Sequence, residues 1–230
     1  SRTISFYRST IRQILERATG RVIPYNPERK VKIAQRIGNP AEPRRALTGE
    51  EQRWIWDTPH RGQPVAIIMM LSGLRRGELT ALTWNDIDTK KRQITVNKAV
   101  AYLSDGTPII KDAKSTAGMR VIDIPSKLCA YLDTLPRDST LVVHTQKGTL
   151  MTESAWTKLW SSYMRLLNAK YGSGIVKHQG IPGRPGPKSY EMTIPPITMH
   201  WLRHTFCTLM YLAGVDVITA SKQMGHADVA

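Results

Sequence analysis

Three short runs rich in β-branched residues lie together in the middle of the chain and constrain the fold most strongly. They are RQITVNKAV from residue 92, TPIIKDA from residue 107 and MRVIDIP from residue 119, and the turn sequences SDGT and KSTAG separate them. Short β-rich runs joined by such turns are typical of antiparallel hairpins. We therefore expect two hairpins that together form a small antiparallel sheet of three strands.

The sequence on both sides of these runs has a helical pattern instead. Residues 4–20 carry an apolar stripe that ends at Gly20, and Thr48 and Glu51 have the spacing of a capping box that begins the next helix. Further helices are expected over residues 63–82, interrupted by the turn SGLRRG, and over 126–135, 152–168, 198–213 and 217–230. The predicted fold class is α+β: a mainly α-helical domain with a small three-stranded antiparallel sheet.

The first 45 residues differ from the rest in composition. They hold one helix without partner elements, followed by a segment with four prolines and many bases, which is typical of a linker. We therefore divide the chain into residues 1–45, the end of a truncated upstream domain plus a linker, and residues 46–230, the main domain. Within the main domain, the Gly- and Pro-rich residues 171–196 are expected to form a long loop or a hairpin insertion.

The charge balance narrows the class of partner. Lys and Arg number 33 against 18 Asp and Glu, for a formal net charge of +15. Bases scattered along a whole chain favour a polyanion over a membrane surface, although a simply basic soluble protein remains an alternative. No apolar run reaches membrane-spanning length, no secretory signal is recognisable, and Cys129 and Cys207 lie far apart. We expect a cytoplasmic protein that binds nucleic acid and no membrane.

The segment HWLRHTFCTL brings His200, Arg203 and His204 onto one helix face, because residues three and four apart are helical neighbours. Two histidines at this spacing suit zinc, but Trp201 occupies the position where a zinc helix of this kind carries glutamate. No third ligand is evident nearby. A phosphate clamp and a purely structural cluster are the remaining alternatives.

Three further segments carry ionisable side chains near turns. SGLRRGEL places Arg75 and Arg76 beside Glu78, where a guanidinium could bind phosphate in a bidentate manner or simply be neutralised by the carboxylate. KDAKSTAGMR contains two lysines on a turn, and QMGHADVA places a histidine after a glycine. Each segment alone is equally compatible with a solvated basic loop.

In their order along the chain, these segments resemble the catalytic domain of the tyrosine recombinases, the integrases of phages and conjugative elements. SGLRRGEL resembles the first family motif, HWLRHTF the second, and MGHADVA the segment before the nucleophile. RQILERATGRVIPYNPERK resembles the end of the core-binding domain and the start of its linker. The resemblance thus implies that residues 1–45 end a core-binding domain and that residues 46–230 form a catalytic domain, truncated before its nucleophile.

The resemblance also implies roles for individual residues. The catalytic positions fall on Arg75, Lys114, His200, Arg203 and His226, with Lys111 as the alternative lysine and with Glu78 and His204 in supporting positions. Contacts to the DNA backbone are expected from Arg29, Lys30, Lys32, Arg36, Arg44 and Arg45. The family's nucleophilic tyrosine follows the second histidine by about nine or ten residues and is therefore expected beyond Ala230, while Tyr211 is interpreted as a core or interface residue.

The activity implied by the resemblance is site-specific recombination through a 3′-phosphotyrosyl intermediate, without metal or other cofactor. The implied partners are double-stranded attachment-site DNA and further copies of the chain, as a homotetramer on paired sites in a bacterial cell. A chain without the tyrosine is expected to be inactive by itself. The alternatives are a non-catalytic DNA-binding regulator with the same fold and a type IB topoisomerase, which the small size and the linker disfavour.

Overall fold

A computed structural model of the chain describes residues 2–31, 45–112, 118–172 and 192–225. The chain divides into two compact units, Ser1–Pro43 and Arg44–Ala230. This division falls close to the predicted boundary at residue 45. The assignment of the smaller unit to a core-binding domain remains a prediction.

The smaller unit consists of helix α1 (Arg2–Ala18) and the short 3₁₀ helix η1 (Pro27–Lys30). Glu28 in η1 is buried and forms an ion pair with Arg8 of α1, while Asn26 caps η1 and donates its side-chain amide to the carbonyl of Arg12 at 3.3 Å. These contacts fold the chain back along α1. The predicted apolar stripe is present, but the described residues of this unit leave part of it exposed, including Tyr7.

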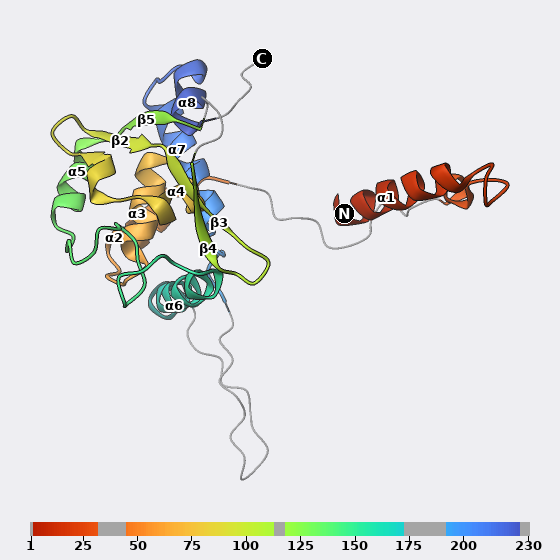
Figure 1. Cartoon of the computed structure of the whole chain (residues 1–230). Coiled ribbons are helices and arrows are strands. Elements are labelled where there is room, and N and C mark those ends of the chain that lie inside the picture. Colours follow the sequence, from red (N-terminus) through yellow and green to blue (C-terminus); the bar gives the residue numbers. More distant parts are fainter. Residues whose placement is uncertain (1, 32–44, 113–117, 173–191, 226–230) are drawn as a thin grey trace, which may run out of the picture. The chain divides into compact units, whose positions relative to one another are not determined.

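The larger unit is built around helix α3, whose residues from Val65 to Met70 are almost completely buried. Other helices surround it on several sides (Figure 1), and α3 packs against α2, α4, α5 and α7. The helices of this unit are α2 (Gly49–Trp56), α3 (Gln63–Ser72), α4 (Arg76–Ala81), α5 (Ser126–Asp133), α6 (Glu153–Tyr171), α7 (Met199–Leu212) and α8 (Val217–Met224), with the 3₁₀ turn η2 (Trp84–Asp86). The predicted helices of this unit and the capping box of Thr48 and Glu51 are confirmed, except that the last helix, expected over residues 217–230, ends at Met224.

The β structure is antiparallel as predicted, but its pairing differs in part. The strands are β1 (Ile87–Asp88), β2 (Gln93–Val96), β3 (Lys98–Tyr102), β4 (Pro108–Asp112) and β5 (Arg120–Asp123). The expected hairpin of β3 and β4 is confirmed, whereas β5 pairs with β2 in a separate three-stranded sheet of order β1-β2-β5. The predicted second hairpin is therefore wrong. Ile94 and Ile122 lie opposite each other in the β2–β5 ladder and are both fully buried, so burial of this pair favours the observed register.

The Gly- and Pro-rich segment predicted over residues 171–196 lies largely outside the described residues. Its described ends are held by Asn168 of α6, whose side-chain oxygen accepts hydrogen bonds from the backbone nitrogens of Thr193 at 2.8 Å and Ile194 at 3.2 Å. The buried amide of Asn168 thus fixes where the chain re-enters the fold before α7.

Within the described residues, no helix is both long and apolar enough to cross a membrane. Tyr211 is 74% exposed in the last turn of α7, so it is not a core residue, and its alternative interpretation as an interface residue remains a prediction. Met210 is half-buried and packed against the core, whereas Tyr211 and Leu212, the last two residues of α7, are exposed.

Candidate functional site

Two glycines, Gly73 in the turn between α3 and α4 and Gly77 in the first turn of α4, let this part of the chain approach two other elements closely. Gly73 has φ +66°, and a Cβ atom there would lie 2.3 Å from the ring of Phe206 on α7. A Cβ atom on Gly77 would lie 2.6 Å from the carbonyl oxygen of Val100 on β3. Both glycines are therefore required for the close approach of this turn to α7 and to the β3–β4 hairpin. Arg75 lies between them, at the point where these elements meet.

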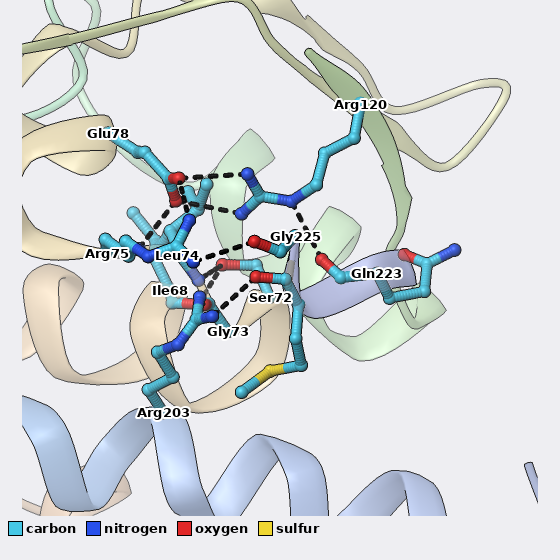
Figure 2. Close-up of polar contacts among 11 residues, drawn as sticks. Ile68, Ser72, Gly73, Leu74, Arg75, Glu78, Arg120, Arg203, Gln223 and Gly225 are labelled. Carbon is cyan, nitrogen blue, oxygen red and sulfur yellow. Dashed lines mark hydrogen bonds and ion pairs between the residues drawn. The ribbon is translucent and has the colours of Figure 1, made fainter. Parts of the chain in front are cut away.

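Glu78, in the first turn of α4, accepts several of the polar contacts shown in Figure 2. Its carboxylate accepts hydrogen bonds from the backbone nitrogen of Arg75 at 2.8 Å and from Nη1 of the same residue at 2.9 Å. Arg120, the first residue of β5, donates from Nη1 at 2.9 Å and from Nη2 at 2.8 Å. Four donors thus occupy a carboxylate that has about four acceptor positions.

The environment of Glu78 keeps its carboxylate charged. Burial alone raises the pKa of Glu78, but the hydrogen bonds and positive charge of Arg120, followed by the hydrogen bonds from Arg75, outweigh it and leave the pKa below its ordinary value. Arg120 is as buried as Glu78, with 6% and 7% of their side chains exposed. A buried charge pair of this kind is stable only when both partners are hydrogen-bonded, as they are in this site.

Arg203 enters the same site from α7. Trp201, Leu202 and Phe206 on this helix are buried in the core, and their burial turns Arg203 inward so that it is only 7% exposed. Its two terminal nitrogens donate to the carbonyl oxygens of Gly73 and Met224. Burial, and then the positive charge of Arg75, lower the pKa of Arg203 to about 10. The guanidinium therefore remains positively charged at neutral pH.

These residues form an arginine cluster, by which we mean Arg75, Arg120 and Arg203 grouped around Glu78. Three guanidiniums and one carboxylate give the cluster a formal charge of +2. Arg75 has 44% of its side chain exposed, so the cluster is accessible to solvent at that residue. A fixed, partly buried excess of guanidinium charge favours an anion such as phosphate.

The two arginines of the SGLRRG turn have different surroundings. Arg75 turns toward Glu78 and donates from Nη2 to the carbonyl oxygen of Gly225 at 2.8 Å. Arg76 turns toward Glu153 on α6, with an N–O distance of 3.4 Å, and its guanidinium lies over the ring of Tyr102. The structure therefore separates one arginine that faces the cluster from one that faces a neighbouring helix.

His200 and His204 lie one turn apart on α7 and contact each other. Their rings meet edge to face with 4.8 Å between centroids, His200 being exposed and His204 half-buried. Arg203 lies between them in sequence and points into the cluster. In the part of the chain that the structure describes, no group of three or more His, Cys, Asp and Glu residues is arranged to hold a metal ion.

The structure does not describe the predicted lysine or the second histidine, but it describes residues near them. Lys114 and His226 lie outside the described residues. Lys111, the alternative lysine, lies on β4 and lines a cleft of about 390 Å³ together with Arg75 and Glu78. Gly225, the residue before His226, contacts Arg75 directly. The structure thus brings Arg75, Glu78 and Arg203 together and places Lys111 in the adjoining cleft.

The predicted DNA-backbone contacts are also covered in part, since Lys32, Arg36 and Arg44 lie outside the described residues. Arg29 forms an ion pair with Glu16 at 3.0 Å. Arg45 forms two hydrogen bonds to Glu51, at 2.5 and 2.6 Å, and lies over the ring of Trp201 at 4.5 Å from its centroid. Lys30 lies over the ring of Tyr25. Phosphate contacts of these bases remain a prediction.

Two contributions to the site were absent from the sequence prediction. Arg120 pairs with Glu78 across 42 positions of sequence, and Arg45 connects the start of the larger unit to α7 through Trp201. A backbone contact strengthens this second connection, because the nitrogen of Leu47 donates to the hydroxyl of Thr205 at 2.9 Å. Neither pairing has a short-range sequence signal, since each depends on how distant elements pack.

Sequence comparisons place the larger unit in a known family. The profile of the Phage integrase family matches residues 57–230. A "Tyrosine recombinase XerC-like" protein of Caldanaerobacter subterraneus subsp. tengcongensis is 24% identical over 217 residues, which is 91% of this chain and 52% of the relative. The "ICEBs1 integrase" of Bacillus subtilis is 25% identical over 171 residues, covering 70% of this chain and 40% of the relative. The chain therefore spans about half the length, or less, of these curated relatives.

Solved structures share the fold. The Tn1549 transposon integrase in complex with circular intermediate DNA superposes with a TM-score of 0.73 at 19% identity, covering 99% of this chain and 72% of that one. A lambda integrase dimer bound to a core site superposes with a TM-score of 0.55 at 19% identity, covering 96% and 70%. The motif resemblance and the α+β fold class are thereby confirmed, and the chain belongs to the phage integrase family of tyrosine recombinases.

Proposed function

We propose that this chain carries the phosphate-binding part of the active site of a site-specific DNA recombinase, which cleaves and rejoins DNA through a 3′-phosphotyrosyl intermediate. The observation that carries the proposal is that Arg75 and Arg203 lie in one cluster with Arg120 and the buried carboxylate of Glu78, and that this cluster has a formal charge of +2. That charge matches the two negative charges of a pentavalent phosphorane. Such a site is complementary to the transition state of phosphoryl transfer.

In the proposed reaction, a tyrosine oxygen attacks the phosphorus of a DNA phosphodiester and the bond from phosphorus to the 5′ oxygen breaks. The product is a 3′-phosphotyrosyl bond and a free 5′ hydroxyl, which can later attack the same bond on another strand. The bond energy is kept in the phosphotyrosine, so ATP is not needed. Arg75 and Arg203 hold the non-bridging oxygens. Each such donor lowers the activation free energy by about 3 kcal/mol.

Proton transfers complete the proposed mechanism. Lys114 protonates the leaving 5′ oxygen, with Lys111 as the alternative because it lines the cleft beside Arg75. His200 assists loss of the tyrosine proton, and His226 donates a hydrogen bond to the phosphate. Glu78 and His204 support these groups, Glu78 by holding the guanidinium of Arg75 in one orientation. Fixed orientation matters because a misplacement of about 1 Å can lower the rate about 100-fold.

We propose that the nucleophile is a tyrosine outside residues 1–230, so that these residues alone do not cleave DNA. Two described tyrosines near the core, Tyr131 and Tyr163, lie in surroundings that disfavour the phenolate form. Burial raises the pKa of Tyr131 to about 12 and also raises the pKa of Tyr163. The hydroxyl of Tyr102 donates to the carbonyl oxygen of Met151 at 3.0 Å.

The proposed partner is double-stranded DNA at an attachment site, bound by a homotetramer on paired sites in the cytoplasm of a bacterial cell. Structural relatives support this assembly: a lambda integrase is known as a tetramer bound to a Holliday junction. The formal charge of +15 supports a polyanionic partner. Binding should therefore weaken steeply as salt is added.

Arginine-to-lysine substitutions in the SGLRRG turn test the proposed clamp in the protein expressed from its native reading frame. Lysine keeps the charge but cannot donate in a bidentate manner, so Arg75→Lys should slow cleavage of nicked attachment-site DNA by about 100-fold or more while leaving most of the DNA affinity. Arg76→Lys is the matched control, since Arg76 faces Glu153, and should cleave like the wild type.

Two outcomes would count against this reading. If Arg75→Lys cleaves as fast as Arg76→Lys, the clamp assignment is wrong. If the wild type binds the DNA but forms no cleaved product, the alternative of a non-catalytic regulator with the same fold is supported instead.

A further inference from the structure

The last three carbonyl oxygens at the end of α8 each accept a hydrogen bond from a different arginine. Nε of Arg120 donates to Gln223 at 2.9 Å, Nη2 of Arg203 donates to Met224, and Nη2 of Arg75 donates to Gly225 at 2.8 Å. Figure 2 shows these three guanidiniums, which come from β5, α7 and the turn before α4, meeting at this helix end. The arginine cluster therefore holds a helix terminus as well as a carboxylate.

This arrangement follows from the chemistry of helix ends. The final carbonyls of a helix have no intrahelical donor and carry partial negative charge. Gly225 ends α8 in the left-handed conformation, with φ 63°, which lets the chain leave the helix while its carbonyl reaches Arg75. The two proposed phosphate ligands are thus in direct contact with the residues that precede His226.

Arg120 differs from the other two arginines because the protein itself uses all three of its nitrogens. Nη1 and Nη2 donate to Glu78 and Nε donates to the carbonyl of Gln223, and only 6% of the side chain is exposed. Its guanidinium therefore binds two groups: Glu78, which also binds Arg75, and the end of α8, where Arg75 binds the carbonyl of Gly225. Arg120 is therefore suited to orient other residues rather than to bind a ligand.

A second contact between β5 and α8 fixes the same helix end. The side chain of Gln223 accepts a hydrogen bond from the backbone nitrogen of Asp123 at 3.0 Å and donates to the Asp123 carboxylate at 3.1 Å. Arg120 and Asp123 are the first and last residues of β5. Both ends of β5 therefore contact the C-terminal end of α8 through Gln223. The strand itself is paired with β2 in the antiparallel ladder.

We propose that Arg120 is a positioning residue of the phosphate site: it holds Glu78 against Arg75, and it holds the C-terminal end of α8 against Arg75 and Arg203. The inference rests on the proposed function, because it assigns Arg120 a part in placing the groups that contact the phosphate. Without Arg120, Arg75 is the ion-pair partner that Glu78 keeps among the described residues, and the end of α8 loses one of its three arginines.

Arg120→Lys tests the proposal in the protein expressed from its native reading frame. Lysine preserves the positive charge beside the buried carboxylate, but its single nitrogen cannot reproduce the fork that binds Glu78 and the carbonyl of Gln223 together. We expect the single-turnover cleavage rate at saturating DNA to fall by about 100-fold, as for a misplaced reacting group, while the DNA affinity stays near that of the wild type. Arg137→Lys, in an exposed ion pair with Asp133, is the matched control and should change neither quantity.

The split between rate and affinity separates positioning from a general structural role, because a globally destabilised protein loses both. Circular dichroism and thermal unfolding establish whether each variant is folded. If Arg120→Lys does not fold, the double variant Arg120→Met with Glu78→Gln removes the buried pair without leaving an unpaired charge. That variant should fold and bind DNA but cleave slowly.

The proposal is overturned if either folded variant cleaves at the wild-type rate, or if rate and affinity fall together in a folded variant. Failure of the proposed function looks different. In that case the wild type itself forms no cleaved product, or Arg75→Lys cleaves normally, whatever Arg120→Lys does.

Discussion

At the scale of single residues, the site depends on how completely one carboxylate is used. Glu78 accepts four hydrogen bonds from two arginines, and its neighbour Arg203 is buried with its terminal nitrogens on backbone carbonyls. The pairing of Glu78 with Arg75 could be anticipated from their spacing at a helix start. The pairing with Arg120 could not, because it depends on β5 lying beside α4.

Replacement of Glu78 should expose this dependence in a measurement of stability. Glu78→Gln leaves Arg120 buried without a counter-charge, which should lower the free energy of unfolding at neutral pH by about 3–5 kcal/mol. Because the folded-state pKa of Glu78 lies below the ordinary value of 4.5, its charge stabilises the fold above that pH, and this contribution is lost as the pH falls through the folded pKa. Urea unfolding at several pH values should show a shallower acid loss in Glu78→Gln than in the wild type. Parallel curves would contradict the assignment.

At the scale of secondary-structure elements, the helices were predictable and the strand pairing was only partly so. Capping residues such as Thr48 and apolar periodicity mark helix ends within the sequence itself. The partner of β5 is set by burial of Ile122 against Ile94, which no local turn signal specifies. The break between β2 and β3 at Asn97 likewise follows from two strands entering different sheets.

The turn that carries Arg75 offers a test at this scale. Gly73→Ala and Gly214→Ala both place alanine at positive φ, which costs about 1–2 kcal/mol. Only at Gly73 does the new methyl group meet another atom, 2.3 Å from the ring of Phe206, whereas nothing lies within 4 Å at Gly214. Overpacking should add about 1–3 kcal/mol to the loss for Gly73→Ala, measured by urea unfolding. Equal losses for the two variants would show that the turn does not need its close approach to α7.

At the scale of the whole molecule, composition and motif order were more informative than any single segment. The charge of +15 indicated a polyanionic partner, and the order of the four motifs indicated the family, which the profile match over residues 57–230 confirms. The convergence of α3, α4, α7, α8 and β5 on one cluster could not be predicted, because it follows from packing between residues up to 150 positions apart. The proposed function depends on this packing, because no single element carries the whole cluster.

The central claim is that the cluster serves covalent cleavage of DNA, and capture of the covalent adduct tests it most directly. The protein expressed from its native reading frame is incubated with genomic DNA from its source, denatured with detergent and recovered with any attached DNA, whose blocked ends are then sequenced. We expect adducts joined through tyrosine to 3′ phosphates at a defined site, abundant for the wild type and strongly reduced for Arg75→Lys. Wild-type protein that binds this DNA and yields no tyrosine-linked 3′ ends would contradict the central claim.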